Sequence, residues 1–204
     1  MKIVTFNEKE ILKNQLNNDK VIAFPTETVF GLGANSFSNV AFNNLVKVKE
    51  RSPDKPFTLM CYSIDQIKDI VYINDIAKKI IEKFMPGSIT LLLKAKENIP
   101  YYLHLNSKYI GVRIPSDKDL LAFLQYYGKP LLVPSANKSN EAPATSIKEV
   151  FDYFEGEIEY CVLGKCTTNL PSTIIQVDDE DIKVIRKGPI LEETIREAIK
   201  WKLY

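Results

Sequence analysis

The feature that most constrains the fold is a series of short apolar segments, separated by longer segments whose apolar residues recur with a helical period. The short segments predict β-strands over 21–24, 57–62, 88–94, 110–114, 131–133, 173–177 and 182–185. The last two can form a hairpin through the acidic turn 178–181. Because strands and helices intermingle without strict alternation, the 204 residues predict a single α/β domain over 1–204, a mixed β-sheet with helices packed on it.

Short polar residues mark the predicted starts of the helices. Asn7 and Glu10 have the spacing of a capping box for a first helix. Further N-caps are predicted at Ser38, Ser63, Asn74, Ser116 and Ser146, and a last helix over 191–202. Gly128 is predicted to end the helix that Ser116 begins, because glycine readily adopts the left-handed conformation that closes a helix.

The charge is nearly balanced, with 27 basic and 26 acidic residues and a net charge of +1. This excludes a global positive field for nucleic acid, so any such contact needs a local patch. No segment approaches the roughly 18 apolar residues that a membrane span needs, and the N-terminus lacks the apolar core of a secretory signal. The sequence therefore predicts a cytoplasmic protein without a membrane partner.

The cysteine and histidine content argues against two kinds of site. Cys61, Cys161 and Cys166 are odd in number and lack the pattern of a disulfide framework, and a zinc site at 161–166 is disfavoured against small buried side chains. His104 is the single histidine, which makes a Ser-His-Asp triad improbable. We therefore predict no metal ligands in the chain.

Polar residues gather in the loops that follow the predicted strands, where open α/β sheets bind ligands. These loops are 25–28 with 31–33, 49–51 with Lys55, 113–115, 135–137, 171–173 and 186–188. Gly31 and Gly33 form either part of a binding loop or simply a glycine-rich turn. Ser36 stands where a dinucleotide fingerprint needs a third glycine.

Arginine is scarce, with only Arg51, Arg113, Arg186 and Arg196, so each position is informative. Lys49, Arg51 and Lys55 form a cationic cluster that either complements a helix dipole or forms a solvated face, or instead binds an oxyanion. Pro53 and Pro56 favour oxyanion binding, because they make the segment a rigid loop.

Arg113 interrupts an apolar run, so its charge must reach the surface or find a partner. It either faces outward on an alternating strand or points into a cleft and holds a carboxylate. Ser135 and Asn137 directly follow the apolar segment 131–133, where they either bind a nucleotide or form a turn. Cations, hydroxyls and backbone N–H groups suit transfer at a phosphate. The residues alone thus indicate a cytosolic α/β domain with an anion pocket.

The same residues carry a resemblance to a known family. Seven short motifs stand in the order of the YrdC family, the threonylcarbamoyl-AMP synthases: FPTETVFGLG (24–33), KER (49–51) with PDKPF (53–57), PGSIT (86–90), GVRIP (111–115), SANKS (135–139), PSTII (171–175) and IRKG (185–188). The resemblance covers nearly the whole chain. It is a resemblance to the single-domain form of the family. It implies a YrdC-like fold, a twisted mixed β-sheet flanked by helices with a concave substrate cleft.

The resemblance implies an ATP-dependent nucleotidyltransferase. The amine of L-threonine takes up bicarbonate, and the resulting carbamate attacks the α-phosphate of ATP with release of pyrophosphate. Mg²⁺ accompanies ATP. Other proteins, the tRNA threonylcarbamoyl-transferases, then use the product beside the anticodon, and this chain itself makes at most a weak tRNA contact.

The family pattern also implies roles for particular residues. Lys49 and Arg51 are expected to be catalytic. The expected ATP-binding residues are Lys49, Arg51, Lys55, Ser135, Asn137 and Arg186, and the expected L-threonine-binding residues are Thr28, Arg113 and Ser172. Met60 stands where several relatives carry histidine. Two other functions remain open: a non-catalytic RNA-binding member of the fold, and a carbamoyl-transfer enzyme with another acceptor amine.

Overall fold

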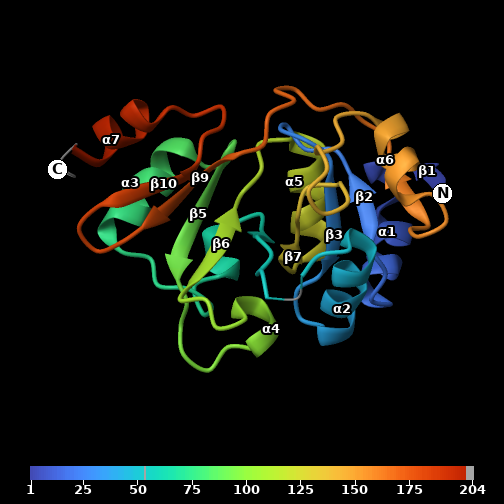
Figure 1. Ribbon diagram of the computed structural model, residues 1–204, viewed down its shortest axis with the longest axis horizontal. Helices are drawn as coiled ribbons and strands as arrows, with labels where there is room; N and C mark the ends of the chain where they lie inside the picture. Colours follow the sequence, from blue (N-terminus) through green and yellow to red (C-terminus); the bar gives the residue numbers. More distant parts are fainter. Residues whose placement is uncertain (53, 201–204) are drawn as a thin grey trace.

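The computed structural model describes residues 1–52 and 54–200 (Figure 1). Ten strands form one mixed sheet. The strands are β1 Lys2–Val4, β2 Ile22–Phe24, β3 Gly31–Asn35, β4 Leu59–Met60, β5 Ile89–Lys94, β6 Tyr109–Arg113, β7 Leu131–Leu132, β8 Tyr160–Val162, β9 Thr173–Val177 and β10 Ile182–Arg186. Their order in the sheet is β1-β8-β2-β3-β7-β4-β6-β5-β9-β10. The predicted α/β class and the predicted hairpin of β9 and β10 are confirmed.

The helices pack around this sheet. The α-helices are α1 Lys9–Asn17, α2 Asn39–Lys49, α3 Asp75–Phe84, α4 Tyr101–His104, α5 Lys118–Tyr127, α6 Ile147–Phe154 and α7 Glu192–Lys200, and two 3-10 helices are η1 Phe6–Glu8 and η2 Ile64–Gln66. In Figure 1, α3 and α7 lie with β5, β9 and β10, whereas α1, α2, α5 and α6 lie with β2, β3 and β7. No helix in the described ranges is long and apolar enough to cross a membrane.

The predicted helix caps are partly confirmed. Ser38, Asn74 and Ser146 accept hydrogen bonds from the first turns of α2, α3 and α6. Gly128 ends α5 with φ of 78°. Two predictions were wrong because a neighbouring residue takes the position: the first capping box joins Thr5 to Glu8, and Asp117 rather than Ser116 caps α5. Ser63 does occupy the N-cap position of the 3-10 helix η2, but its side chain makes no capping hydrogen bond.

The glycine pair 31 and 33 lies in strand β3 rather than in a turn. β3 pairs antiparallel with β2, which places Gly33 opposite Ile22. A Cβ at Gly33 would lie 2.4 Å from Cε1 of Phe24, so the glycine is needed for close packing against that ring. The sequence also failed to predict β1, β8 and α4, which are very short. Pro53 and the predicted helical residues 201–202 lie outside the described residues.

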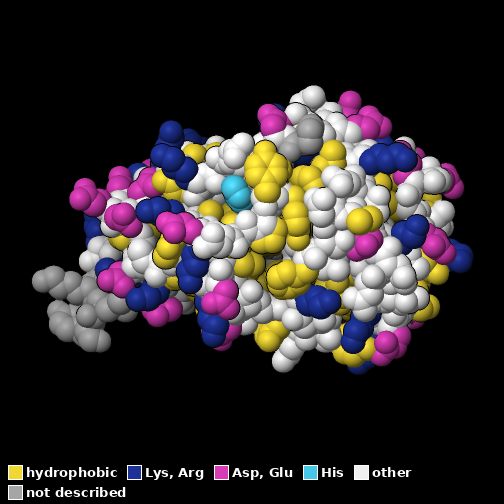
Figure 2. Space-filling view, turned by 90° about the horizontal axis from the view of Figure 1, so that it is seen from below, with side chains coloured by type: hydrophobic (Ala, Val, Ile, Leu, Met, Phe, Trp, Pro, Cys, Tyr) yellow, Lys and Arg dark blue, Asp and Glu magenta, His cyan; other side chains and the backbone are white. Residues whose placement is uncertain are grey.

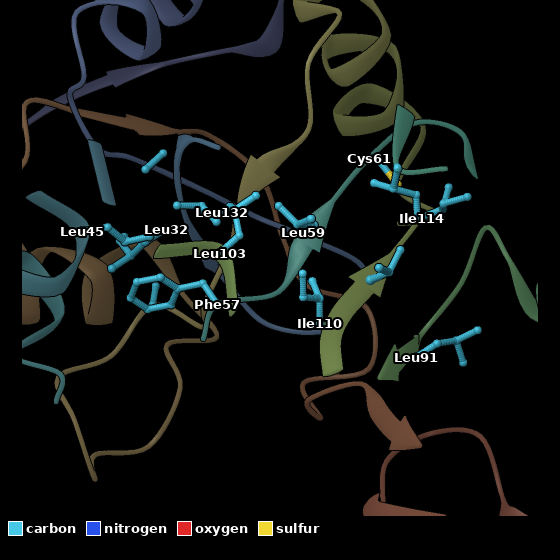
Figure 3. Packing of buried hydrophobic residues seen from close by; sticks show 14 of the residues in the cluster. Leu32, Leu45, Phe57, Leu59, Cys61, Leu91, Leu103, Ile110, Ile114 and Leu132 are labelled. Atoms are coloured by element: carbon cyan, nitrogen blue, oxygen red, sulfur yellow. The ribbon is translucent and has the colours of Figure 1, made fainter. Parts of the chain in front are cut away.

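Buried aliphatic and aromatic side chains fill the space between the sheet and its helices (Figure 3). Leu32, Leu59 and Leu132 come from neighbouring strands and are essentially inaccessible to solvent. Burial of such a side chain contributes about 1.5–3 kcal/mol. This core fixes the strands, and with them the loops that follow the strands.

Strand register brings four distant segments to one end of the sheet. β6 is antiparallel to β5, so the end of β6 at Arg113 lies beside the start of β5. β5 and β9 are parallel, with Ile89 opposite Thr173. β9 and β10 are antiparallel, with Arg186 opposite Ile174. The last residues of β6 and β10 therefore meet the first residues of β5 and β9.

Candidate active site

A cavity of about 420 Å³ opens where these segments meet. Arg51, Arg113 and Arg186 line it together with Ser135 and Ser172. Among the described residues that line it there is no Asp or Glu. Three of the four arginines of the chain thus share one cavity without an acidic residue in its wall, which is the electrostatic character of an anion site. In Figure 2, hydrophobic side chains gather near the middle of the face seen from below.

Arg113 points into the cavity from the end of β6, and its side chain is only 7% exposed. Its Nη2 donates to Oε1 of Glu27 at 2.7 Å and to Oγ1 of Thr28 at 2.8 Å. Thr28 is itself held by Thr26, whose Oγ1 lies 2.8 Å from Oγ1 of Thr28. The charge that interrupts the apolar run therefore has both a buried partner and access to the cavity.

Arg186 and Ser172 form a second polar group of the wall. Nε and Nη2 of Arg186 donate to the carbonyl oxygen of Ser172 at 3.0 and 2.9 Å. The Ser172 hydroxyl lies 2.8 Å from Oγ1 of Thr90 on β5. Burial lowers the pKa of Arg186, and the positive charge of Arg113 lowers it further. The two guanidinium groups repel each other, so an anion between them would be stabilised.

Arg51 reaches the cavity from the segment after α2. Its guanidinium lies 5.2 Å from the centre of the Phe57 ring, and burial lowers its pKa. Its buried Nε has no hydrogen-bond partner among the described residues. Glu50, which precedes it, adopts a left-handed conformation with φ of 50° and ends α2. A half-buried cation in the wall of the cavity suits an anionic ligand.

Lys49 is almost fully buried and is not one of the residues that line the cavity. Its ammonium donates to the carbonyl oxygen of Ser135 at 2.7 Å and to O and Oδ1 of Asn137 at 3.0 and 2.9 Å. The Ser135 hydroxyl also donates to Oδ1 of Asn137 at 2.7 Å. Burial lowers the pKa of Lys49 to about 7, with a contribution from the charge of Arg51. Lys49 thus holds the 135–137 loop in place.

The structure brings five of the nine predicted site residues to the cavity wall: Arg51, Arg113, Ser135, Ser172 and Arg186. The other four, Lys49, Lys55, Thr28 and Asn137, are not part of it. Thr28 and Asn137 lie directly behind wall residues, whereas Lys55 is exposed. Met60, which stands where several relatives carry histidine, lines the cavity.

Sequence reasoning missed Glu27, Thr26 and Thr90. Glu27 is the buried partner of Arg113, Thr26 lines the cavity, and Thr90 binds Ser172. Glu27 and Thr26 lie within the motif FPTETVFGLG, and Thr90 lies within PGSIT, so the motifs themselves carried the signal. The pairing of Glu27 with Arg113 required tertiary structure, because 86 residues separate them.

The described residues contain no group of three or more His, Cys, Asp or Glu side chains that could hold a metal ion. The cysteines are all free, and Cys61 and Cys161 are buried. Mg²⁺ prefers carboxylate and phosphate oxygens, and the described residues of the cavity wall include no carboxylate. A protein-bound magnesium ion therefore does not fit this wall.

Fold and cavity together define an α/β protein with an anion-binding cleft, and comparison with known proteins gives its family. A model of the Sua5, YciO and YrdC proteins, described as "Telomere recombination", matches residues 14–188. The chain belongs to this family. A relative from Methanocaldococcus jannaschii is 35% identical in an alignment of 197 positions that covers 93% of each chain. The threonylcarbamoyl-AMP synthase of Wigglesworthia glossinidia brevipalpis is 33% identical, over 86% of this chain and 91% of its own.

Solved structures show the same fold. The structure of Pyrococcus abyssi Sua5 complexed with L-threonine superposes with a TM-score of 0.92 at 28% identity, over 98% of this chain. The chain spans 61% of that longer protein. Escherichia coli YciO, with a TM-score of 0.81 and 23% identity, covers 90% of both chains. The predicted YrdC-like fold is confirmed.

Proposed function

We propose that this chain is a threonylcarbamoyl-AMP synthase that uses ATP, L-threonine and bicarbonate. The observation that carries the proposal is the cavity in which Arg51, Arg113 and Arg186 meet without an acidic side chain in the described wall. Close relatives that bear the name of this enzyme support it. The product serves the threonylcarbamoyl-adenosine modification of tRNA, and we propose that the enzyme acts in the cytoplasm.

In the proposed reaction, the neutral amine of threonine attacks bicarbonate, a C–N bond forms, and water leaves. An oxygen of the resulting carbamate attacks the α-phosphorus of ATP. The bond from the α-phosphorus to the bridging oxygen breaks, and pyrophosphate leaves with the electron pair. Two anions must approach each other, so the main task of the protein is to neutralise charge and align the reactants.

We assign ATP to the part of the cavity near Arg51, Ser135 and Arg186. Arg51 and Arg186 both contribute a guanidinium group to the wall of this cavity. Lys49 and Asn137 support Ser135 from behind, so their contribution in this state is to fix the loop. Lys55 would join the phosphates only if its exposed segment moved toward the cavity. Magnesium enters as part of the MgATP substrate, bound to the phosphate oxygens.

We assign L-threonine to the part of the cavity near Arg113 and Ser172. Arg113 supplies a cation for the carboxylate, and the hydroxyls of Ser172 and Thr26 are within the wall. The structure of Pyrococcus abyssi Sua5 with L-threonine supports an amino-acid site in this fold. Thr28 acts through Arg113, because its Oγ1 accepts a hydrogen bond from Nη2 of Arg113.

Threonine-dependent release of pyrophosphate from ATP tests the proposal. We expect release only when ATP, L-threonine and bicarbonate are all present, and a product in which the threonylcarbamoyl group is joined to AMP. Release that required another amine instead of threonine would identify a related carbamoyl-transfer enzyme. Binding of tRNA without pyrophosphate release would identify a non-catalytic RNA-binding member.

Arg51→Ala tests the assignment of ATP in the same pyrophosphate-release assay. A charge-assisted contact to phosphate contributes about 1.5–3 kcal/mol, so turnover should fall at least tenfold while the fold persists. Arg196→Ala is the control, because Arg196 pairs with Glu192 and Asp181 outside the cavity. Wild-type turnover in the Arg51 variant would remove Arg51 from the site.

A further inference from the structure

The buried carboxylate of Glu27 has no role in the reaction proposed above, yet it contacts a cation of the cavity wall. Its Oε1 accepts from Nη2 of Arg113 at 2.7 Å, and the two side chains are 9% and 7% exposed. Glu27 itself does not line the cavity. It therefore contacts Arg113 without being part of the cavity wall itself.

Some N–H donors of Arg113 bind neighbouring side chains, and others remain for a ligand in the cavity. A guanidinium has five N–H donors, two of them on Nη2. Glu27 and Thr28 use Nη2 together, and Nε is buried without a partner among the described residues. Within the described part of the chain, Nη1 makes no hydrogen bond, and it is the remaining donor of a side chain that lines the cavity.

We infer that Glu27 is a positioning residue for the amino-acid subsite: with Thr28 it holds Nη2 of Arg113 in the wall and presents Nη1 to the carboxylate of the ligand. This inference rests on the proposed function, because it assumes an amino-acid carboxylate at Arg113. A guanidinium held at one nitrogen has lost its rotational freedom before the ligand arrives, so less entropy is lost on binding.

The backbone of Glu27 is itself fixed from a distant segment. Its carbonyl oxygen accepts from the N–H of Thr167 at 3.1 Å and of Thr168 at 3.0 Å. The hydroxyl of Thr168 donates to the same oxygen at 3.3 Å. The carboxylate therefore extends from a clamped point in the chain, which a positioning residue requires.

Two substitutions separate orientation from charge. Glu27→Gln keeps an oxygen that can accept from Nη2, and its amide replaces Oε2, which has no hydrogen-bond partner among the described residues. It therefore removes the charge of Glu27 but no hydrogen bond. Glu27→Ala removes both the charge and the hydrogen bond, and it leaves Thr28 as the only one of these two partners of Arg113. Glu192→Ala is the matched control, because Glu192 also pairs with an arginine, at 2.8 Å, outside the cavity.

Calorimetry with L-threonine and, separately, with MgATP tests the inference. We expect Glu27→Ala to weaken threonine binding at least tenfold and ATP binding less than twofold. Glu27→Gln should stay within about threefold of the wild type for both ligands. In turnover, Glu27→Ala should raise KM for threonine much more than it lowers kcat. Glu192→Ala should change none of these values.

Retained ATP affinity in each variant shows that it is folded. Wild-type threonine affinity in Glu27→Ala would overturn the inference, and so would equal losses in the Ala and Gln variants, because the glutamine keeps the acceptor. If Glu27→Ala lost the binding of both threonine and MgATP while Glu27→Gln bound both normally, Glu27 would be a residue that stabilises the fold instead. If the wild-type protein binds threonine but releases no pyrophosphate, the proposed function fails while the role of Glu27 is still decided.

Discussion

The buried cations around the cavity differ in how their charge is compensated. Arg113 has the carboxylate of Glu27, Arg186 has the carbonyl and hydroxyl oxygens of Ser172, and Lys49 has three oxygens of the 135–137 loop. Neutral oxygens compensate a buried charge less completely than a carboxylate does. The residues with neutral partners should therefore respond most strongly to pH and to anionic ligands.

Substitution of Arg113 by lysine should weaken the binding of all amino acids by similar factors. A single ammonium would have to serve Glu27, Thr28 and the ligand, which Arg113 serves through separate nitrogens. Because the carboxylate is common to threonine and serine, Arg113→Lys should weaken the binding of threonine and of serine by similar factors. The affinity for ATP should stay nearly unchanged. Calorimetry with both amino acids measures this. A variant that lost ATP affinity and kept threonine affinity would place Arg113 on the nucleotide.

Lys49 should make the free energy of unfolding depend on pH. In the unfolded chain its pKa is close to the ordinary value of 10.5, whereas burial lowers it to about 7 in the folded protein. Between these values the unfolded state binds more protons, so the contribution of Lys49 to stability rises from pH 7 to about pH 10. Below pH 7 both states are protonated and this contribution is constant.

Urea denaturation at pH 6, 7.5 and 9 measures the effect. The difference in free energy of unfolding between the wild type and Lys49→Met should grow in favour of the wild type from pH 7.5 to pH 9. Lys47→Met is the control, because Lys47 is exposed on the same helix. A difference that did not change with pH would mean that the three oxygens keep the ammonium fully charged.

At the scale of elements, the cavity depends on the close approach of two chain segments. A Cβ at Gly188 would lie 2.4 Å from N of Thr173 and 2.5 Å from O of Pro171, and both are backbone atoms. The segment 171–173 carries Ser172, to which Arg186 donates from the end of β10. The packing of these two segments therefore sets the geometry of one side of the site.

Gly188→Ala should push these two segments apart. Overpacking of this kind lowers the free energy of unfolding by about 1–3 kcal/mol. It should also raise KM for ATP and for threonine in the pyrophosphate-release assay, because the contact between Arg186 and Ser172 is displaced. Gly128→Ala is the control: its φ of 78° makes alanine unfavourable by about 1 kcal/mol, but it closes α5 outside the cavity wall and should leave KM unchanged. Equal KM values for Gly188→Ala and the wild type would show that the segment tolerates the shift.

At the scale of the whole molecule, the cavity joins parts of the chain that are distant in sequence. Arg51 follows α2, Ser135 follows β7, and Arg186 ends β10. A ligand that contacts all three links the elements grouped around β2 and β3 to those grouped around β5 and β9 (Figure 1). Binding should therefore stabilise the folded chain as a unit.

MgATP should raise the thermal midpoint of the protein. At a concentration 100 times its Kd, a ligand adds about 2.7 kcal/mol, which for a chain of this size corresponds to roughly 5–11 °C. Arg51→Ala should lose most of this shift, whereas Arg196→Ala should keep it. Scanning calorimetry with and without MgATP measures both. An unchanged midpoint in the wild type at saturating MgATP would contradict the assignment of ATP to this cavity.

The sequence by itself determined the α/β class, most strands and five of the residues that line the cavity, because apolar periodicity, capping residues and scarce arginines are local signals. It could not place Gly31 and Gly33 in a strand, because the packing of Gly33 against Phe24 is a tertiary contact. That 1–204 forms one domain stays a prediction. Tertiary structure alone decided that Lys49 binds Ser135 and Asn137 and that Glu27 meets Arg113. Both depend on strand pairing and core packing, which bring together residues more than 80 positions apart.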